Sequence, residues 1–474
     1  MASTSNADTS TISLPVVFTT QTSYPLPSQK FMIPATWKRY QLSQLVNKAL
    51  ALPKPVPFDF LVKGEILRTT LAEWAAENGV GEEETLEIEY IESVMPPEKV
   101  SDFPHEDWVS SVSCKLQGQF ITASYDGHIR TFDYSQATTS SVHAHSAPIT
   151  SICLVPSSSA LDTDTDTHII ASASHDLTAQ LTQLSLRAPT KATPLATLHL
   201  HTAPLSSIAS NTTGTHLLTA SWDGLIGLWD TSVPASDEVP DLTPSERERK
   251  KRRREDEGLK KKVPRKAPLG VLKSHIGRVS KALFSAASGE GGGGGGGTAY
   301  SCGFDSTVRV WDTENGVCVH TISVFAFSSS SDSIKYPQTA SEKPFLDLAP
   351  APAPAPAFQH TVLAASTDRT VTLYDVRAPT PTQAINPPIS FMHPATPSCL
   401  SSQQSSTHQH QFVSGAYDGI VRLWDLRSVK GALATFRAWP GAEKVLSVDV
   451  DWERGLVGVG GEGGFAVWKV GNAR

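Results

Sequence analysis

The feature of this sequence that most restricts its fold is a β-hairpin pattern that returns seven times along the chain. The clearest copy is ASWDGLIGLWD at 220–230, where two runs of strand-forming residues flank an Asp-Gly pair. Glycine takes the positive-φ position of a tight turn at little steric cost, and the aspartate side chain can bond the backbone of the turn. The pattern therefore predicts two antiparallel strands at each copy.

The copies share the spacing from an acidic residue in the turn to an aromatic residue six positions later. Besides Asp223 to Trp229, this spacing is found from Asp126 to Phe132, Asp305 to Trp311, Asp368 to Tyr374 and Asp418 to Trp424. Two weaker copies each change one member, since Asp176 leads to Thr182 and Glu462 leads to Trp468. A histidine followed after three residues by an aliphatic residue precedes four copies, at His105, His145, His201 and His275.

Together these marks resemble the WD40 repeat, in which each copy forms one four-stranded blade of a β-propeller. The resemblance implies that the third blade joins four side chains in one hydrogen-bonded network: His201, Ser221, Asp223 and Trp229. A buried polar group persists only where it is hydrogen-bonded. We therefore interpret the repeated histidines and aspartates as structural residues, not catalytic ones.

Residues 13–93 follow a different pattern. Leu42, Leu45 and Val46 recur at helical spacing, and TLEIEYIE at 85–92 alternates like a strand. Two strands, a helix, further strands, a short helix and a final strand predict an α+β domain of ubiquitin-like (β-grasp) order. The predicted fold class is mainly β, a seven-bladed WD40 β-propeller preceded by a small α+β ubiquitin-like domain.

The same patterns predict the domain boundaries. We expect a disordered N-terminus at 1–12, the ubiquitin-like domain at 13–93, a linker or closing strand at 94–104, and the propeller at 105–474 with a disordered basic insertion at 231–268. A closed propeller leaves no exposed sheet edge at its seam. We therefore predict that part of 94–104, or the segment just before Trp108, supplies a strand to the blade that contains Trp468.

Composition and missing motifs exclude several classes of protein. The net charge of -7 argues against a chain that binds polyanions as a whole. The five cysteines are scattered without a C-x-x-C pair, which indicates a reducing compartment and argues against a disulfide framework or zinc site. No catalytic motif, secretory segment or long apolar run is found. We expect a soluble intracellular protein that is not an enzyme and has no cofactor, no metal of its own, and no small-molecule or membrane partner.

The pairing of the two modules resembles a known family. The stretch PVPFDFLVKGEILRTTL at 55–71, followed by HEDWVSSV at 105–112 and the seven repeats, resembles the Notchless-like ribosome-biogenesis proteins. The resemblance is closer to the WD-repeat subunits of the nucleolar Pescadillo–Bop complex, the fungal Ytm type. It implies a non-catalytic assembly factor for the large (60S) ribosomal subunit, required for pre-rRNA processing and located in the nucleus, nucleolus and nucleoplasm.

The resemblance also implies partners for each domain. It implies that the propeller docks on a Bop-type WD40 scaffold in a trimeric complex with Pescadillo. It implies further that the AAA ATPase Midasin binds the ubiquitin-like domain and releases the protein from the pre-60S particle. Two other classes remain open: a ubiquitin-pathway adaptor whose propeller holds a substrate, and a chromatin propeller that reads a basic peptide.

Three glutamates, Glu82, Glu83 and Glu84, crowd the loop before the strand expected at 85–92. The ordinary interpretation is a solvated acidic loop. The resemblance implies instead that one carboxylate of this loop ligates a metal-ion-dependent adhesion site on Midasin, because magnesium takes oxygen ligands. The distance to the strand places that ligand at Glu83, with Glu82 and Glu84 flanking it.

A dense basic run lies inside the expected insertion. Its centre is formed by Lys250, Lys251, Arg252, Arg253 and Arg254. Three interpretations compete: a nuclear-import segment, which we favour, a contact with ribosomal RNA, or a merely solvated loop. Lysine and arginine neutralise phosphates, but no interleaved aromatic residues are present to stack on bases.

Three aromatic residues are candidates for the contact with the scaffold. Trp108, Trp222 and Tyr417 each stand beside a hairpin aspartate or near a repeat histidine, which places them at strand ends. Aromatic residues are common anchors of protein interfaces. The alternative is that they only pad the rims of their blades.

Overall fold

A computed structural model describes residues 12–81, 83–134, 138–156, 167–185, 191–239, 263–285, 297–322, 343–352, 360–376, 389–402 and 409–471. The chain divides into two compact units, the first built mainly from Met1–Pro97 and the second from most of the remaining chain. The first unit is a small α+β domain, and the second is a β-propeller.

The N-terminal domain has five strands and two helices. The strands are β1 (Ser13–Thr19), β2 (Lys30–Pro34), β3 (Phe58–Val62), β4 (Glu65–Ile66) and β5 (Leu86–Glu92), and the helices are α1 (Arg39–Ala49) and α2 (Leu71–Glu77). The sheet order is β2-β1-β5-β3-β4, with β1 and β5 parallel in the centre. This mixed sheet confirms the α+β architecture expected from the sequence.

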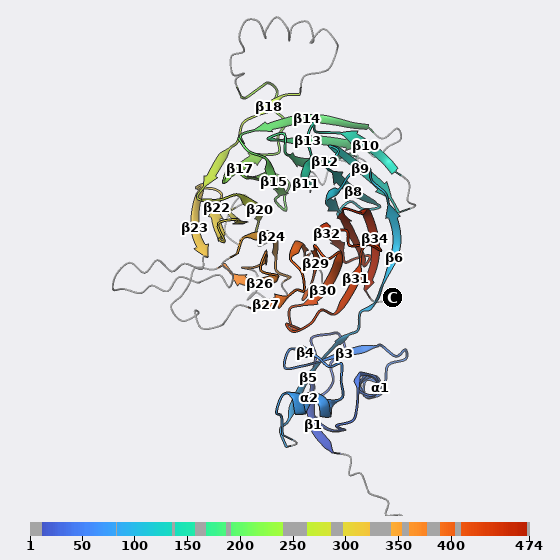
Figure 1. Ribbon diagram of the computed structural model, residues 1–474. Coiled ribbons are helices and arrows are strands. Elements are labelled where there is room, and N and C mark those ends of the chain that lie inside the picture. Colours follow the sequence, from blue (N-terminus) through green and yellow to red (C-terminus); the bar gives the residue numbers. More distant parts are fainter. Residues whose placement is uncertain are drawn as a thin grey trace, which may run out of the picture. The chain divides into compact units, whose positions relative to one another are not determined.

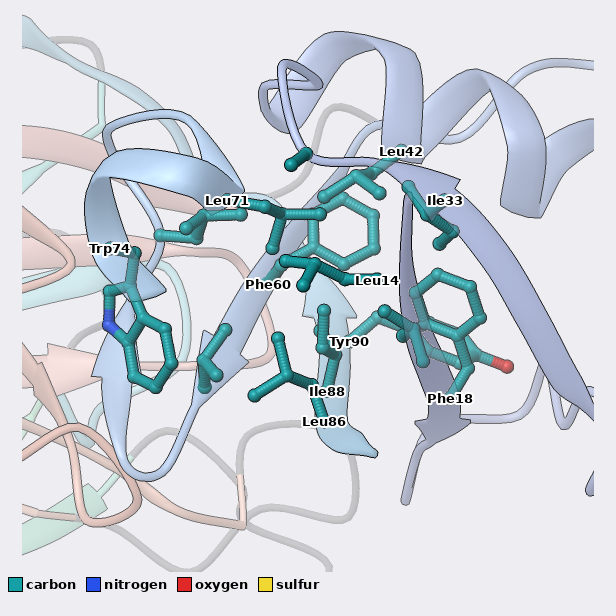
Figure 2. Close-up of a cluster of buried hydrophobic side chains, with 14 of the residues drawn as sticks. Leu14, Phe18, Ile33, Leu42, Phe60, Leu71, Trp74, Leu86, Ile88 and Tyr90 are labelled. Atoms are coloured by element: carbon teal, nitrogen blue, oxygen red, sulfur yellow. The ribbon is translucent and has the colours of Figure 1, made fainter. Parts of the chain in front are cut away.

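The core of this domain lies between the sheet and the helices. Figure 2 shows Phe60, Ile88 and Leu14 of the strands meeting Leu42 and Leu71 of the helices. Helix α2 begins with a capping box, in which Thr70 Oγ1 accepts a hydrogen bond from Glu73 N and Thr70 N donates one to the Glu73 carboxylate. The capping box therefore satisfies two backbone N–H groups at the start of α2, whose apolar face packs in the core.

In the described ranges the propeller contains seven sheets, arranged as a ring in Figure 1, and the added fifth strand of one sheet pairs in parallel. Blade one holds β7 (Val109–Ser113), β8 (Gln119–Ser124), β9 (His128–Asp133) and β10 (Thr138–His143). Blade two holds β11 (Ile149–Val155), β12 (Thr167–Ser174), β13 (Thr178–Ser185), β14 (Lys191–His199) and an added β18 (Arg265–Lys266). Blade three holds β15 (Leu205–Ser210), β16 (His216–Ser221), β17 (Leu225–Asp230) and β19 (Gly270–Lys273).

The remaining four blades repeat the same plan. Blade four holds β20 (Val279–Phe284), β21 (Thr298–Gly303), β22 (Val308–Asp312) and β23 (Val317–Ile322). Blade five holds β24 (Phe345–Pro350), β25 (Thr361–Ser366), β26 (Thr370–Asp375) and β27 (Ser390–Met392). Blade six holds β28 (Pro397–Ser401), β29 (Gln411–Ala416), β30 (Ile420–Asp425) and β31 (Ala434–Arg437). Blade seven holds β32 (Val445–Asp451), β33 (Leu456–Gly461), β34 (Gly464–Gly471) and β6 (Met95–Phe103). The seven sheets confirm the predicted mainly-β propeller.

The last blade is completed by a strand from the other end of the propeller sequence. Strand β6 lies beside β34, and it comes from within the segment 94–104 that the sequence suggests for this role. The side chain of Phe103 stacks on Phe465 at 5.2 Å between ring centroids and lies 4.7 Å from Phe132 of blade one. One aromatic cluster therefore joins the first and last blades.

Neighbouring blades are also joined by hydroxyl groups near the middle of the ring. The second residue of an innermost strand donates to the carbonyl oxygen of the first residue of the next innermost strand. These bonds run from Ser110 to Ile149, Thr150 to Leu205, Ser206 to Val279, Ser280 to Phe345 and Ser398 to Val445. At the other two junctions the position holds Leu346 and Leu446, which have no hydroxyl. The ring thus combines apolar packing with a repeated polar link.

Both ends of the insertion expected to be disordered are described in the structure. Residues 231–239 and 263–268 belong to the described structure, so the expected disorder over 231–268 needs correction at both ends. The Lys266 ammonium group is buried and binds the Asp230 carboxylate and Ser232, while Glu238 N donates to Arg265 O at 2.8 Å. The two ends are ordered because they pair with each other and because Arg265–Lys266 extends the sheet of blade two.

Candidate functional site

The third blade contains a hydrogen-bonded chain from a histidine to a buried tryptophan. His201 Nδ1 lies 3.1 Å from the Asp223 carboxylate, and His201 Nε2 lies 2.9 Å from Thr219 Oγ1. Trp229 Nε1 donates to the same Thr219 oxygen at 2.9 Å. The Thr219 hydroxyl therefore joins the two rings, and Ser221 enters the same network through its hydrogen bond from Asp223 N.

Ser221 forms hydrogen bonds next to this chain of residues. Its hydroxyl lies 2.9 Å from the carbonyl oxygen of Ala203 and accepts the N–H of Asp223 at 3.2 Å, which ties the hairpin to the preceding loop. Thr219 reaches the indole because it stands opposite Gly227 in the sheet. A Cβ atom at Gly227 would lie 2.7 Å from Thr219 Oγ1 and 2.8 Å from Trp229 Nε1. Glycine leaves the space that this bond requires.

Other blades use the same chain or a variant of it. Blade four repeats it in full, with His275, Asp305, Ser301 and Trp311. Blade two has His145, Asp176 and Ser172, but Thr182 replaces the tryptophan. In blades one and six the histidines bond a backbone carbonyl oxygen and a hydroxyl, while Arg130 and Arg422 pair with Asp126 and Asp418.

The sequence analysis missed the histidine of blade six. His393 Nε2 lies 2.8 Å from Ser414 Oγ and Nδ1 lies 3.2 Å from Phe391 O. The residue four positions later is Pro397, not an aliphatic residue, so the histidine pattern does not include it. In blade seven, Trp439 packs instead against Gly461 and Gly463.

Burial and hydrogen bonding set the charge states of Asp305, His393 and Cys399 near neutral pH. Burial alone would raise the pKa of Asp305, but hydrogen bonds from His275 and Thr307 and the charge of Arg309 lower it to about 2. Burial lowers the pKa of His393 to about 4. Burial raises the pKa of the Cys399 thiol to about 12, so this thiol is no nucleophile near neutral pH. Across the described ranges, no three His, Cys, Asp or Glu side chains form a group that could hold a metal ion.

One end of the propeller carries the turns that join the second strand of each blade to the third. We call this end the hairpin face, because each innermost strand begins there and each second strand turns into the third there. Its turns are marked by Tyr125, His175, Trp222, Phe304, Thr367, Tyr417 and Glu462. Each of these turns lies within the described residues. The hairpin face is therefore formed largely by short, well-placed loops.

An arc of aromatic rings crosses this face. Ring centroids are 5.8 Å apart for Trp108 and Tyr125, 6.5 Å for Tyr125 and His175, and 5.2 Å for His175 and Trp222. The guanidinium group of Arg278 lies 4.5 Å above the Trp222 ring. Trp108 and Trp222 thus belong to one continuous surface across blades one to four, partly exposed at 43% and 37%.

Tyr417 lies at the equivalent position of blade six and is 41% exposed. Burial and the neighbouring Cys399 and Tyr125 raise the pKa of Tyr417. The three aromatic candidates from the sequence therefore occupy the same face. The sequence analysis did not select Tyr125, His175 or Arg278, although Tyr125 and His175 stand directly before a hairpin aspartate, as Trp222 does.

The acidic loop of the N-terminal domain presents an exposed carboxylate. Glu84 N donates to Gly81 O at 3.2 Å, and the Glu84 carboxylate lies 3.3 Å from Lys63 Nζ. Glu83 is exposed and has no hydrogen bond or ion pair within the described part of the chain. Glu82 lies outside the described residues, as do Lys250, Lys251, Arg252, Arg253 and Arg254.

Comparisons with known proteins assign both modules. A family model described as the NLE (NUC135) domain matches residues 14–75, and the WD domain, G-beta repeat, matches 98–133, 192–230 and 389–425. No helix in the described ranges is long and apolar enough to span a membrane.

Curated relatives match the chain almost from end to end. A "Ribosome biogenesis protein YTM1" of Laccaria bicolor is 60% identical, with 99% of each chain covered. The protein of the same name from Coprinopsis cinerea is 55% identical, with 98% of this chain and 96% of the relative covered. That of Coccidioides immitis is 32% identical over 86% of this chain and 79% of its own.

Proposed function

The chain belongs to the YTM1 family of ribosome biogenesis proteins, and from this premise we propose that it is a non-catalytic assembly factor of the large (60S) ribosomal subunit. Its two domains bind different partners, and neither performs a chemical step. The propeller docks on a Bop-type WD40 scaffold in a trimeric complex with Pescadillo. The N-terminal domain is the part that Midasin grips to remove the protein from the pre-60S particle.

The observation that carries the proposal is the aromatic arc of the hairpin face. Four rings from three blades, with Arg278 stacked on the last, form a partly exposed surface on short loops. Aromatic and arginine side chains dominate the energetic centres of protein interfaces. The aspartates that follow His175 and Trp222 are hydrogen-bonded to His145 and His201, so these two turns of the arc rest on satisfied polar groups.

The carboxylate of Glu83 supports the role proposed for the N-terminal domain. An exposed carboxylate with no partner of its own is available as an oxygen ligand for a magnesium ion held by another protein. Glu84 is less suited because it already pairs with Lys63. We assign the trans-acting ligand to Glu83.

The proposed location is the nucleus, mainly the nucleolus and nucleoplasm. The basic run at 250–254 is a nuclear-import segment in this proposal, and contact of the same run with pre-ribosomal RNA is compatible with it. On the C-terminal side of the run, Arg265–Lys266 pairs with strand β14 of blade two.

Affinity purification of the full chain from nuclear extract tests the proposal. The expected co-purifying proteins are the Bop-type scaffold, Pescadillo and pre-60S components, and Trp222→Ala is expected to reduce the scaffold selectively while the protein stays folded. Recovery of ligase or proteasome subunits would instead support the adaptor class, and recovery of histones would support a chromatin reader. Unfolding of the Trp222→Ala variant would mean that Trp222 only supports its blade.

A further inference from the structure

The loop that opens blade four projects a single aliphatic side chain from the hairpin face. Ile276 is 94% exposed, the highest value among the large hydrophobic side chains that are exposed in the described structure. It stands between the network histidine His275 and Gly277. Phe304 of the adjoining turn is 44% exposed, so the tip of blade four is apolar.

This loop is held rigidly from beneath. His275 lies 2.9 Å from the Asp305 carboxylate and 2.7 Å from Ser301 Oγ. The backbone N–H of Ile276 donates to the same carboxylate at 3.2 Å. A Cβ atom at Gly277 would lie 3.2 Å from Asp305 N, so the loop packs closely on the hairpin turn. A side chain on such a loop loses little backbone freedom when it binds a partner.

The blade does not need an aliphatic residue at this position. In blade three the equivalent residue is Thr202, whose backbone N–H donates to Asp223 at 3.1 Å in the same way. In the other blades with a network histidine, the equivalent residues are Glu106, Ser146 and Pro394. The structural role belongs to the backbone, and the exposed isoleucine is a feature of blade four alone among these blades.

A positive charge stands beside the isoleucine. Arg278 is stacked on Trp222 and has no ion pair within the described part of the chain. The carbonyl oxygen of Arg278 accepts the N–H of Phe304 at 2.8 Å, which fixes the backbone of the arginine. One rigid loop therefore presents the exposed aliphatic side chain of Ile276 and the fixed positive charge of Arg278.

We propose that Ile276 is the central anchor of the propeller's contact with its scaffold and enters an apolar pocket whose rim carries a carboxylate for Arg278. The proposal rests on the function proposed above and deepens it. It places the centre of the contact at the loop that opens blade four, whose Arg278 stacks on the last ring of the aromatic arc. It also states the chemistry of the partner's site: apolar at the bottom and acidic at the edge.

Binding of full-length variants to the purified Bop-type scaffold of the same species, measured by calorimetry, tests this proposal. Ile276→Thr copies the residue of blade three and is expected to fold normally while weakening binding at least tenfold. Leu269→Thr is the matched control, because Leu269 is 58% exposed at the opposite end of blade three and should bind as the unaltered chain does. Arg278→Gln should weaken binding and reduce its dependence on salt.

The outcomes separate this proposal from the proposed function. If the unaltered chain fails to bind the scaffold, the proposed partner is wrong, and the anchor proposal falls with it. If the unaltered chain binds and Ile276→Thr binds within twofold of it, only the anchor is wrong. A thermal melt of each variant checks folding, and Ile276→Ser, which copies blade two, replaces the threonine variant if that variant melts early.

Discussion

Single side chains decide how each hairpin turn of the propeller is tied to its blade. In blade three the hairpin aspartate Asp223 pairs with His201, and the bond continues through a hydroxyl to Trp229. Where Arg130 takes the aspartate, the histidine turns to a backbone carbonyl oxygen. Asp305 combines both arrangements, with His275 at 2.9 Å and Arg309 at 3.4 Å. Each solution satisfies a buried polar group with a different partner.

The bond between Thr219 and Trp229 requires a residue without a side chain at position 227, and this can be tested. Gly227→Ala is expected to destabilise the protein by about 1–3 kcal/mol, because the added methyl group overpacks the contact between Thr219 and Trp229. Chemical denaturation measures the change. Gly270→Ala is the control, since its nearest neighbour would lie 4.0 Å away, an ordinary contact. Equal effects of the two substitutions would contradict the steric argument.

The buried histidines predict that stability depends on pH. Burial outweighs the opposing hydrogen bond to the Phe391 carbonyl oxygen and lowers the pKa of His393 to about 4, below the value of about 6.5 in an unfolded chain. The unfolded state therefore binds more protons between these values, and stability falls as pH decreases through this window. His393→Gln should reduce the stability loss between pH 7 and pH 5 by about 2 kcal/mol, measured by denaturant unfolding at each pH. An unchanged pH dependence would contradict the prediction.

At the scale of elements, strand β6 closes the ring. It precedes blade one in sequence yet is the outermost strand of blade seven, so the seam depends on residues at both ends of the propeller sequence. The seam has Leu446 where five other junctions have a hydroxyl, and it relies on the cluster of Phe103, Phe132 and Phe465.

Truncation of this cluster should open the seam. Phe103→Ala is expected to cost about 3–5 kcal/mol, because it removes a buried ring and leaves a cavity between blades one and seven. Val100→Ala on the same strand is the control, since Val100 is 49% exposed and should change stability by less than about 0.5 kcal/mol. Thermal melting of the full chain separates the two. A similar melting temperature for both variants would show that β6 is not needed for closure.

At the scale of the whole molecule, a substitution in one domain should not affect partner binding by the other domain. Glu83→Ala is expected to leave folding and scaffold binding intact while abolishing magnesium-dependent binding to Midasin, because it removes the proposed oxygen ligand. Glu83→Asp should also weaken binding, since it is one methylene shorter. A pull-down with and without magnesium measures both effects.

The neighbouring glutamates supply the controls for this prediction. Glu84→Ala should bind normally, because Glu84 is paired with Lys63 in the structure. Loss of binding in Glu82→Ala or Glu84→Ala, with normal binding in Glu83→Ala, would show that the ligand is a neighbour of Glu83. Normal binding by the triple alanine variant would show that this loop is not the site at all.

The sequence by itself determined the features that depend on near neighbours along the chain. The turn chemistry of Asp223 and Gly224 and the seven copies of the six-residue step predict the hairpins and the number of blades, because a hairpin is formed by residues close in sequence. The helical spacing of Leu42 and Val46 likewise predicts the buried face of α1.

Only the tertiary structure decided features that join separate blades or opposite sheet positions. It added Thr219 to the network of His201, Ser221, Asp223 and Trp229 because Gly227 faces Thr219 across the sheet, a pairing set by register and not by local pattern. It brought Trp108, Tyr125, His175 and Trp222 into one arc because ring closure sets the distance between neighbouring blades. The exposure of Ile276 follows from the same cause, since the folded hairpin beneath it, and not its hydrophobicity, sets where the side chain lies.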